Sequence, residues 1–230
     1  MKLRGVGGKQ WALPAAAVAL VVLSGCGEIT PGTASVVNGT RITNDQVNDL
    51  AKAQCVAADL AAESGQSTSM AISRVKQQSL GLLLDTELSK QYAEDEGLEP
   101  QKSMSDGFYS QLEPGITPLP GKTRTEIEKV FGDWAVGRAI LVEAGSKSTG
   151  EEPTFTNIEK LMNAGLQARD GWLKTADITT DPRYAPTEQG FPGGGDSSVS
   201  QAGSAFAKGA TAAEPDPNWV SGLPANQKCG

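Results

Sequence analysis

The residues best suited to chemistry in this chain of 230 residues are three cysteines, Cys26, Cys55 and Cys229. The sequence has no histidine, which excludes a Ser-His-Asp triad, a Cys-His nucleophile and a histidine-ligated zinc site. No CxxC spacing occurs, so thioredoxin-like chemistry is excluded too. The glycine-rich "FPGGGDSS" from Phe191 follows no expected strand and precedes no expected helix, so it does not predict a phosphate site. We expect no catalytic residue, no cofactor and no metal; a mechanism using only Asp and Glu is the one enzymatic alternative left.

Cys26 follows a segment organised like an export signal. Three basic residues precede an apolar run at 11–23 that is too short to span a bilayer comfortably. The letters "LSGC" ending at Cys26 resemble the lipobox of bacterial lipoproteins. This resemblance implies a signal peptide at 1–25, acyl chains on Cys26, and an exported protein held at the outer face of the cytoplasmic membrane. The alternatives are a signal peptide cleaved elsewhere and a retained transmembrane anchor; no stop-transfer pattern supports the latter.

The charge of the chain limits its partners. Without the leader, 17 basic residues face 27 acidic ones, a net charge near −10. Such a surface repels nucleic-acid phosphates, so we expect no nucleic-acid partner. It also disfavours adhesion to anionic lipid headgroups, which leaves the acyl anchor as the contact with the membrane.

Cys55 and Cys229 remain once Cys26 is assigned to lipid. An exported protein meets an oxidising environment, where an even pair of cysteines tends to be joined. A Cys55–Cys229 disulfide would draw the end of the chain back across the helices, where Phe191, Phe206 and Trp219 of that segment would cover an apolar groove. The alternative is a buried Cys55 that packs as a small apolar residue and a free Cys229 thiol.

Composition divides the chain into four parts. After the signal at 1–25, residues 26–34 have the character of a short tether, and residues 35–184 form one domain large enough for a core. More than half of residues 185–230 are Gly, Pro, Ser or Ala. Such a segment buries too little apolar area to offset its ordering entropy, so we expect a disordered tail.

Apolar spacing within the domain predicts five helices. The first opens with a capping box at Thr43 and Gln46, and its inner face is rich in alanine, which predicts close approach to a neighbour. The second has apolar residues all round and should be central. "GITPLPG" is expected to be a loop, and Thr123 with Glu126 forms another capping box. The expected helices cover about 43–63, 67–96 with Gly97 as the stop, a short stretch before Pro114, 123–147 and 156–176.

Two short segments have the character of strands. Val36 and Val37 precede Asn38-Gly39, a pair that favours a tight turn. A strand this short needs a partner, and the other strand-like segment is 177–180. Pairing 35–37 with 177–180 would join the two ends of the domain. The fold class is therefore mainly α, five helices with a two- or three-stranded β element.

Three segments in this order resemble one known family. "ASVVNGTRITNDQV" is similar to the start of the SurA N-terminal domain, and "LLLDTELSKQYAEDEGLEPQKSMSD" resembles its long central helix and the next helix start. "ADITTDPRYA" is similar to the closing strand of lipoprotein members, with Asp181 in place of their Asn and Ala185 in place of their Gly. The resemblance covers residues 35–184. Larger relatives (SurA, PrsA) carry a parvulin prolyl isomerase domain, for which this chain has no room.

The resemblance implies a lipid-anchored, non-catalytic, chaperone-like module. Its partners would be unfolded or newly exported polypeptides, bound in an apolar groove. Phe108, Tyr109 and Leu112 are the candidate binding residues, because they lie on a short helix beside a proline-rich loop where aromatics stay partly exposed. The alternatives are that these three are core residues, and that the protein is a structural lipoprotein with one dedicated envelope partner.

Overall fold

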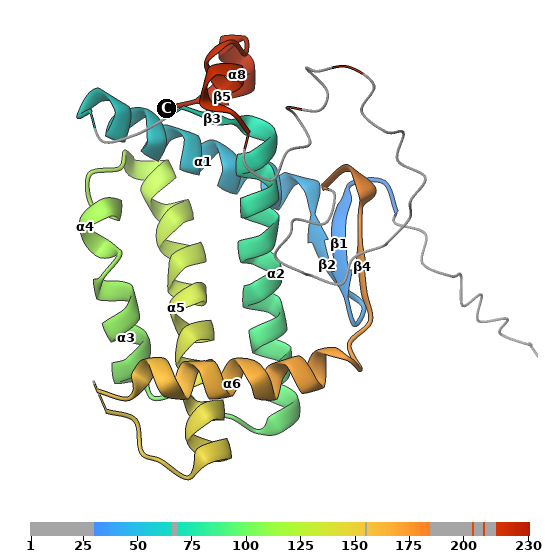
Figure 1. Cartoon of the computed structure of the whole chain (residues 1–230), viewed down its shortest axis with the longest axis vertical. Helices are drawn as coiled ribbons and strands as arrows, with labels where there is room; N and C mark the ends of the chain where they lie inside the picture. The colour runs from blue at the N-terminus through green and yellow to red at the C-terminus, as the bar shows by residue number, and fades with distance from the viewer. Residues whose placement is uncertain (1–29, 66–68, 155, 185–203, 205–208, 210–214) are drawn as a thin grey trace, which may run out of the picture.

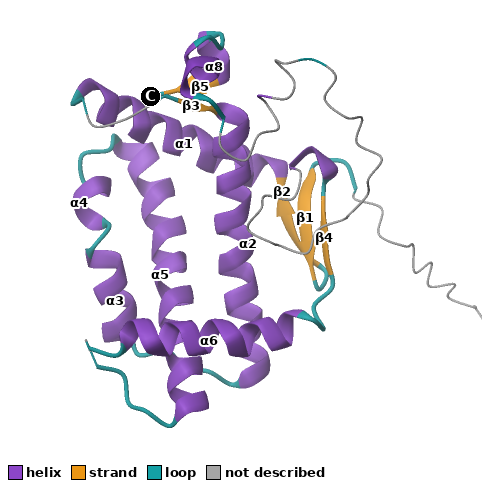
Figure 2. Ribbon diagram, in the orientation of Figure 1, coloured by secondary structure: helices purple, strands orange, loops and turns teal. Residues whose placement is uncertain are grey.

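The computed structural model describes residues 30–65, 69–154, 156–184, 204, 209 and 215–230. Within them the fold is mainly helical with a small antiparallel sheet, as the sequence predicts (Figure 2). Cys26, Phe191 and Phe206 lie outside the described residues. None of the described helices has the length and apolar character needed to cross a membrane.

The sheet joins the two ends of the helical domain. Its strands are β1 (Thr33–Val37), β2 (Thr40–Thr43) and β4 (Ile178–Thr180), in the order β2-β1-β4. Both pairings are antiparallel, and Val36 stands opposite Arg41 on one side and Thr179 on the other. The predicted pairing of 35–37 with 177–180 is confirmed. The sequence did not predict β2 as a strand. With β2 the element has three strands, the larger of the two predicted numbers.

Asn38 is the residue on which this junction depends. It adopts a left-handed φ of 46° in the turn between β1 and β2, a conformation that Asn tolerates better than most residues. Its backbone N–H donates to the Asp177 carbonyl over 2.8 Å, and its side-chain oxygen accepts from the Asp177 N–H over 2.7 Å. Its amide nitrogen donates to Gln91 over 2.9 Å. One turn residue therefore ties the hairpin to β4 and to a helix.

Six helices account for most of the rest of the domain over its described residues. The capping box at Thr43 and Gln46 forms as predicted, and Gly97 ends the second helix in a left-handed conformation. The fourth expected helix begins before its predicted capping box at Thr123. Its N-cap is Pro120, and Gly121 is its first helical residue. The expected loop at "GITPLPG" begins with a short helical turn. The helices are α1 (Asn44–Glu63), α2 (Ile72–Glu96), α3 (Lys102–Ser110), α4 (Glu113–Ile116), α5 (Gly121–Thr149) and α6 (Ile158–Leu173).

Two helices share the centre of the molecule. Helix α5 packs against α1, α2, α3, α4 and α6, whereas α2 packs against α1, α5 and the sheet. Figure 1 shows α2, α5 and the α3–α4 pair with their axes roughly aligned, with α1 across one end and α6 across the other. The sequence predicted only the second helix as central. The apolar residues of α5 account for the difference, because they fall on more than one face: Ile127, Val130, Ala135, Ala139, Ile140, Leu141 and Val142 are all buried.

Helices α5 and α6 cross in backbone contact. A Cβ placed on Gly145 would lie 1.9 Å from the Leu161 carbonyl oxygen, and one on Gly165 would lie 1.9 Å from the Leu141 oxygen. Real Cβ atoms do not approach oxygen so closely, so each helix needs a glycine where the other passes. Leu141 and Leu161 are both fully buried.

A buried ionic cluster lies beside this crossing. The Arg169 side chain donates to Asp85 over 2.7 Å and to Ser89 over 2.9 Å, and Arg138 donates to the other Asp85 oxygen over 3.3 Å. Arg169 is only 6% exposed. Arg138 also lies over the Trp134 ring, with 4.9 Å to its centroid, a favourable cation–π geometry. The cluster ties α2, α5 and α6 together through one carboxylate.

Both predicted boundaries of the domain need correction. Thr33 and Ala34 were expected in the tether at 26–34, but they lie in β1 and are fully buried. At the other end, the expected tail at 185–230 is folded over 215–230. That part comprises α8 (Pro217–Ser221), a short 3₁₀ turn and β5 (Lys228–Cys229), which pairs with β3 (Met70–Ala71). The backbone of β5 finds hydrogen-bond partners in β3, and the amino-acid composition of the tail does not predict this pairing.

Candidate functional site

The candidate site is an open apolar groove of about 480 Å³. It lies between α1, the start of α2, the α4 turn and the N-terminal part of α5, and Met70 of β3 also lines it. Two glutamines, Gln54 and Gln78, are the polar side chains among the described residues that line it. Its apolar lining includes Ala57, Ala58, Leu112, Ile116, Leu119, Ile127 and Phe131.

The groove opens directly onto part of the core. Ile116, Leu119 and Ile127 are 5%, 3% and 3% exposed, and they pack with Leu50 and other buried residues in one cluster. These side chains are therefore held by the core and form a preformed floor. Small residues keep the groove open, because Ala57 and Ala58 on α1 do not reach across it.

One of the three predicted binding residues lines this groove. Leu112 does, and Tyr109 packs on the same core cluster beside it. Phe108 is partly buried but is not among the residues that line the groove. Of the three predicted residues, one therefore lines the groove, one packs beside it and one lies apart from its lining.

Most of the groove was not predicted as a site. Ile127 and Phe131 belong to the apolar stripe of a helix, and such stripes usually indicate core packing. Ile116 lies in a segment expected to be a loop, yet it is buried. The alternation of apolar residues with Pro and Gly in "GITPLPG" was the available signal that this segment packs inward.

The surroundings of the groove carry negative charge. Loss of solvent around the Tyr109 hydroxyl, together with the charges of Glu128 and Glu113, raises the pKa of Tyr109 above its ordinary 10.0. The phenol is therefore neutral at physiological pH. The residues that line the groove include no ionisable side chain within the described parts of the chain. The site is suited to binding apolar groups, and its lining offers no group for proton transfer or nucleophilic attack.

The two remaining cysteines lie beside Met70, one of the residues that line the groove. Cys55 and Cys229 form a disulfide with their Cα atoms 5.1 Å apart. Cys229 stands opposite Met70 in the β3–β5 pairing, and Cys55 is flanked on α1 by Gln54, which lines the groove. Of the two alternatives left by the sequence, the structure contains the bonded pair.

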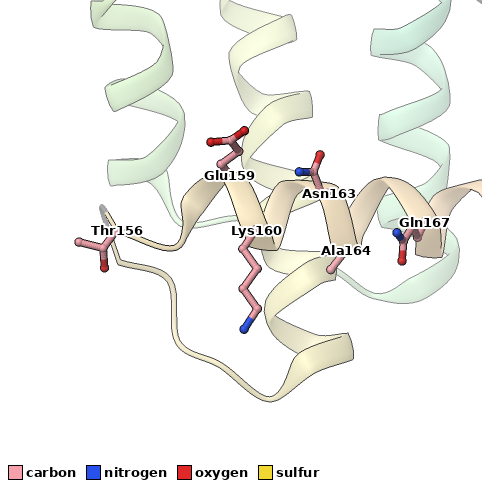
Figure 3. A pocket seen from close by; sticks show the side chains of 6 residues that line it. All are labelled: Thr156, Glu159, Lys160, Asn163, Ala164 and Gln167. Carbon is pink, nitrogen blue, oxygen red and sulfur yellow. The ribbon is translucent and has the colours of Figure 1, made fainter.

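A second hollow, along α6, has a different character. It is lined by Thr156, Glu159, Lys160, Asn163, Ala164 and Gln167. Figure 3 shows that Glu159 and Asn163 extend to one side of the helix while Lys160 extends to the other, so these groups do not converge. The Lys160 ammonium pairs with Glu151 and lowers the pKa of that carboxyl. This hollow is a solvated polar face. Across the described parts of the chain, no group of three or more acidic or cysteine side chains is placed to hold a metal ion.

Comparison with known proteins adds no relative to this geometry: no family model, no curated protein and no solved structure matches the chain.

Proposed function

We propose that this protein is a lipid-anchored, non-catalytic, chaperone-like module that binds extended apolar segments of newly exported polypeptides. The observation that supports the proposal is the open groove, whose apolar floor is held by the core and whose lining has no ionisable side chain. Apolar grooves with a few polar groups are the usual form of sites that take apolar chains.

The size of the groove favours weak, reversible binding. Two or three apolar side chains of a client would fill a volume of this order, and full burial of each contributes about 1.5–3 kcal/mol. Association and ordering of the client cost several kcal/mol. The balance gives affinities around the micromolar range or weaker, so a client can leave without any nucleotide-driven step.

The charge around the groove favours a particular class of client. Glu113 and Glu128 lie within electrostatic reach of Tyr109 at the edge of the groove. The net charge of the chain is −7. Opposite charges across an interface steer encounter and favour one register. Apolar segments flanked by Lys or Arg are therefore the preferred clients.

A binding assay with matched variants tests this function. The probe is fluorescently labelled lysozyme that has been reduced and carboxamidomethylated, so that it stays unfolded, carries no thiol and keeps its net positive charge. Leu112→Asp and Phe131→Asp place a charge in the groove and should each weaken binding at least about tenfold, or 1.4 kcal/mol.

The controls place the same charge elsewhere on the same elements. Leu60 on α1 and Val136 on α5 are 38% and 39% exposed and do not line the groove. Leu60→Asp and Val136→Asp should leave probe binding unchanged. Equal losses in all four variants would show that the groove is not the site. A peptide array separates the alternative function, because a dedicated envelope partner predicts no general binding of apolar peptides.

The anchor forms the other half of the proposal. Cys26→Ala should leave the protein unprocessed or in the aqueous phase after detergent partitioning, because the acyl acceptor is gone. A variant of mature size that still enters the detergent phase would contradict lipid attachment at Cys26.

A further inference from the structure

The segment 216–230 covers an apolar surface that the rest of the domain builds. Its short helix α8 begins with Asp216, whose side chain accepts from the Asn218 N–H over 2.7 Å. Val220 and Leu223 are each 5% exposed and pack on Ala71, which is itself 3% exposed, with Trp219 alongside. Removing the segment would expose these contacts and, on α1 and α2, the neighbouring apolar surface.

The segment is held as an added strand. In the β3–β5 pairing Met70 stands opposite Cys229, and Ala71 opposite Lys228. The Ser69 hydroxyl donates to the Gly230 carbonyl over 2.8 Å. The Gly230 N–H donates to an Asp59 carboxylate oxygen over 2.7 Å. Backbone hydrogen bonds of this kind accept almost any sequence, and side-chain pockets such as those under Val220 and Leu223 supply the preference.

This covered surface is continuous with the apolar groove. The Met70 side chain lines the groove and also packs on the buried cluster that contains Cys229 of β5. Cys55, Met70 and Ile72 also pack with the buried Ala51, Val75 and Cys229 in one cluster. A polypeptide lying in the groove would meet the end of segment 216–230 at Met70.

We propose that the surface of α1 and β3 is a second polypeptide-binding surface, that segment 216–230 is its built-in occupant, and that the Cys55–Cys229 disulfide locks this occupant in place. The proposal rests on the proposed function, because it assigns to the covered surface the same class of client as the groove. The preferred client is a segment that can form one helical turn with two apolar residues three positions apart, the arrangement of Val220 and Leu223 at α8.

The elements of the segment are too small to hold without the disulfide. A helix of five residues and a strand of two are far below the lengths that persist alone. Without the covalent bond, the segment is tethered to Tyr184 by residues 185–214, and its effective concentration at the surface falls as that connection lengthens. An external polypeptide can then compete with segment 216–230 for the surface of α1 and β3.

The lock opens by thiol–disulfide exchange with a dithiol reductant. One thiolate of the reductant attacks a sulfur of the bridge, and the second thiol resolves the mixed disulfide. Cys55 and Cys229 each end as a thiol, the reductant ends as its own disulfide, and two electrons and two protons have moved. Cys55 is partly exposed, whereas Cys229 is 5% exposed. Attack on the Cys55 sulfur, with Cys229 as the leaving thiolate, is therefore the accessible route.

The test compares the oxidised chain, the chain reduced with dithiothreitol, and Cys229→Ser. The probe is the carboxamidomethylated lysozyme described above, which dithiothreitol does not change. Reduction and Cys229→Ser should each raise the affinity for the probe at least about tenfold, since a competing occupant has been released. Hydrogen exchange should accelerate at Met70 and Ala71 and stay slow in β1 and β4. Slow exchange in the sheet shows that the fold survives, so a variant that fails to fold cannot imitate the result.

The outcomes separate the two proposals. Equal probe binding by the oxidised and reduced chains, with Leu112→Asp still weakening it, overturns the lock and leaves the groove function standing. Unchanged exchange at Met70 and Ala71 after reduction overturns the lock as well. No probe binding in any state, even with β3 opened, overturns the proposed function and with it the second surface.

Discussion

Small residues shape both ends of α5, with opposite results. Near its C-terminal end, Gly145 lies against the Leu161 carbonyl of α6, and Gly165 of α6 lies against the Leu141 carbonyl, so the two backbones touch. Near its N-terminal end, α5 faces Ala57 and Ala58 of α1, and an open groove remains. The crossing has a glycine on each helix, and the groove has small residues on α1. At the crossing the backbones fill the space, whereas the space between α1, the α4 turn, β3 and α5 stays open.

The difference shows what small residues indicate in a helical domain. The alanine-rich face of α1 predicted close approach to a neighbour, and several of its alanines are indeed buried. The closest approach in the described helices occurs elsewhere, at glycines whose space is filled by a carbonyl group. A glycine leaves a space of one methyl group, which a backbone carbonyl of the neighbouring helix fills. Ala57 and Ala58 leave a space beside α5 that a ligand can enter. The comparison predicts that extra volume is destructive at the crossing and tolerated in the groove.

The largest expected effect is at the crossing. Gly165→Ala places a methyl group 1.9 Å from the Leu141 oxygen, which forces α5 and α6 apart. Overpacking against backbone should lower the free energy of unfolding by about 3 kcal/mol. Gly171→Ala on the same helix meets nothing within 4 Å and serves as the control, with an expected change of at most about 1 kcal/mol in the stabilising direction. Chemical denaturation measures both, and similar values would refute the backbone contact.

The ionic cluster next to the crossing should be the second most sensitive site. Asp85→Asn leaves Arg138 and Arg169 in a buried place without a carboxylate. Removing one partner of a buried pair costs about 3–5 kcal/mol, and the partial exposure of Arg138, 24% of its side chain, reduces the expected loss to about 2–3 kcal/mol. Adding Arg169→Met to Asp85→Asn should recover part of that loss. Strict additivity of the two changes would show that the groups do not interact.

The groove should tolerate added volume that the crossing does not. Ala57→Leu adds three carbon atoms where α1 borders the groove. We expect the free energy of unfolding to change by no more than about 0.5 kcal/mol. Binding of the unfolded probe should fall about tenfold, because the new side chain takes the place of a client side chain. A large loss of stability would mean that the groove closes in solution, and the comparison with the crossing would fail.

The smallest expected effect concerns acid stability at the closing turn. Hydrogen bonding from the Arg183 side chain is the main cause that lowers the pKa of Asp181 below its ordinary 3.8, and burial opposes it. A lowered pKa in the folded state stabilises the fold above pH 3.8, and this contribution disappears as the pH falls through the folded-state pKa. Asp181→Asn should therefore cost about 0.5–1 kcal/mol at neutral pH and nothing at strongly acidic pH.

Unfolding measured from pH 7 down to pH 2 checks this sign. The two proteins should converge at the acid end, since protonated Asp181 and Asn carry the same charge. A gap that stays constant across this range would assign the effect of Asp181 to its backbone contact with the Arg183 N–H, which does not depend on ionisation in the same way.

Much of the secondary structure was predictable because its causes are local. Thr43 and Gln46 satisfy each other's backbone groups across three residues, and the first helix begins there. Gly97 ends the second helix because a left-handed residue is needed. Asn38-Gly39 makes the turn for the same reason. The capping pair at Thr123 and Glu126 was wrong as a helix boundary. Both residues lie inside α5, which begins at Gly121.

The sequence by itself determined the helical pattern, the turn and cap positions, the acidic charge and the absence of histidine chemistry. Only the tertiary structure decided which distant residues meet. Asp85 and Arg169 are separated by 84 positions, and Cys55 and Cys229 by 174. The apolar stripe of α5 is the same whether a residue such as Phe131 faces the core or a groove, because periodicity identifies an apolar face and carries no information about its neighbour. That choice depends on the sum of contacts across the whole fold, which no local spacing records.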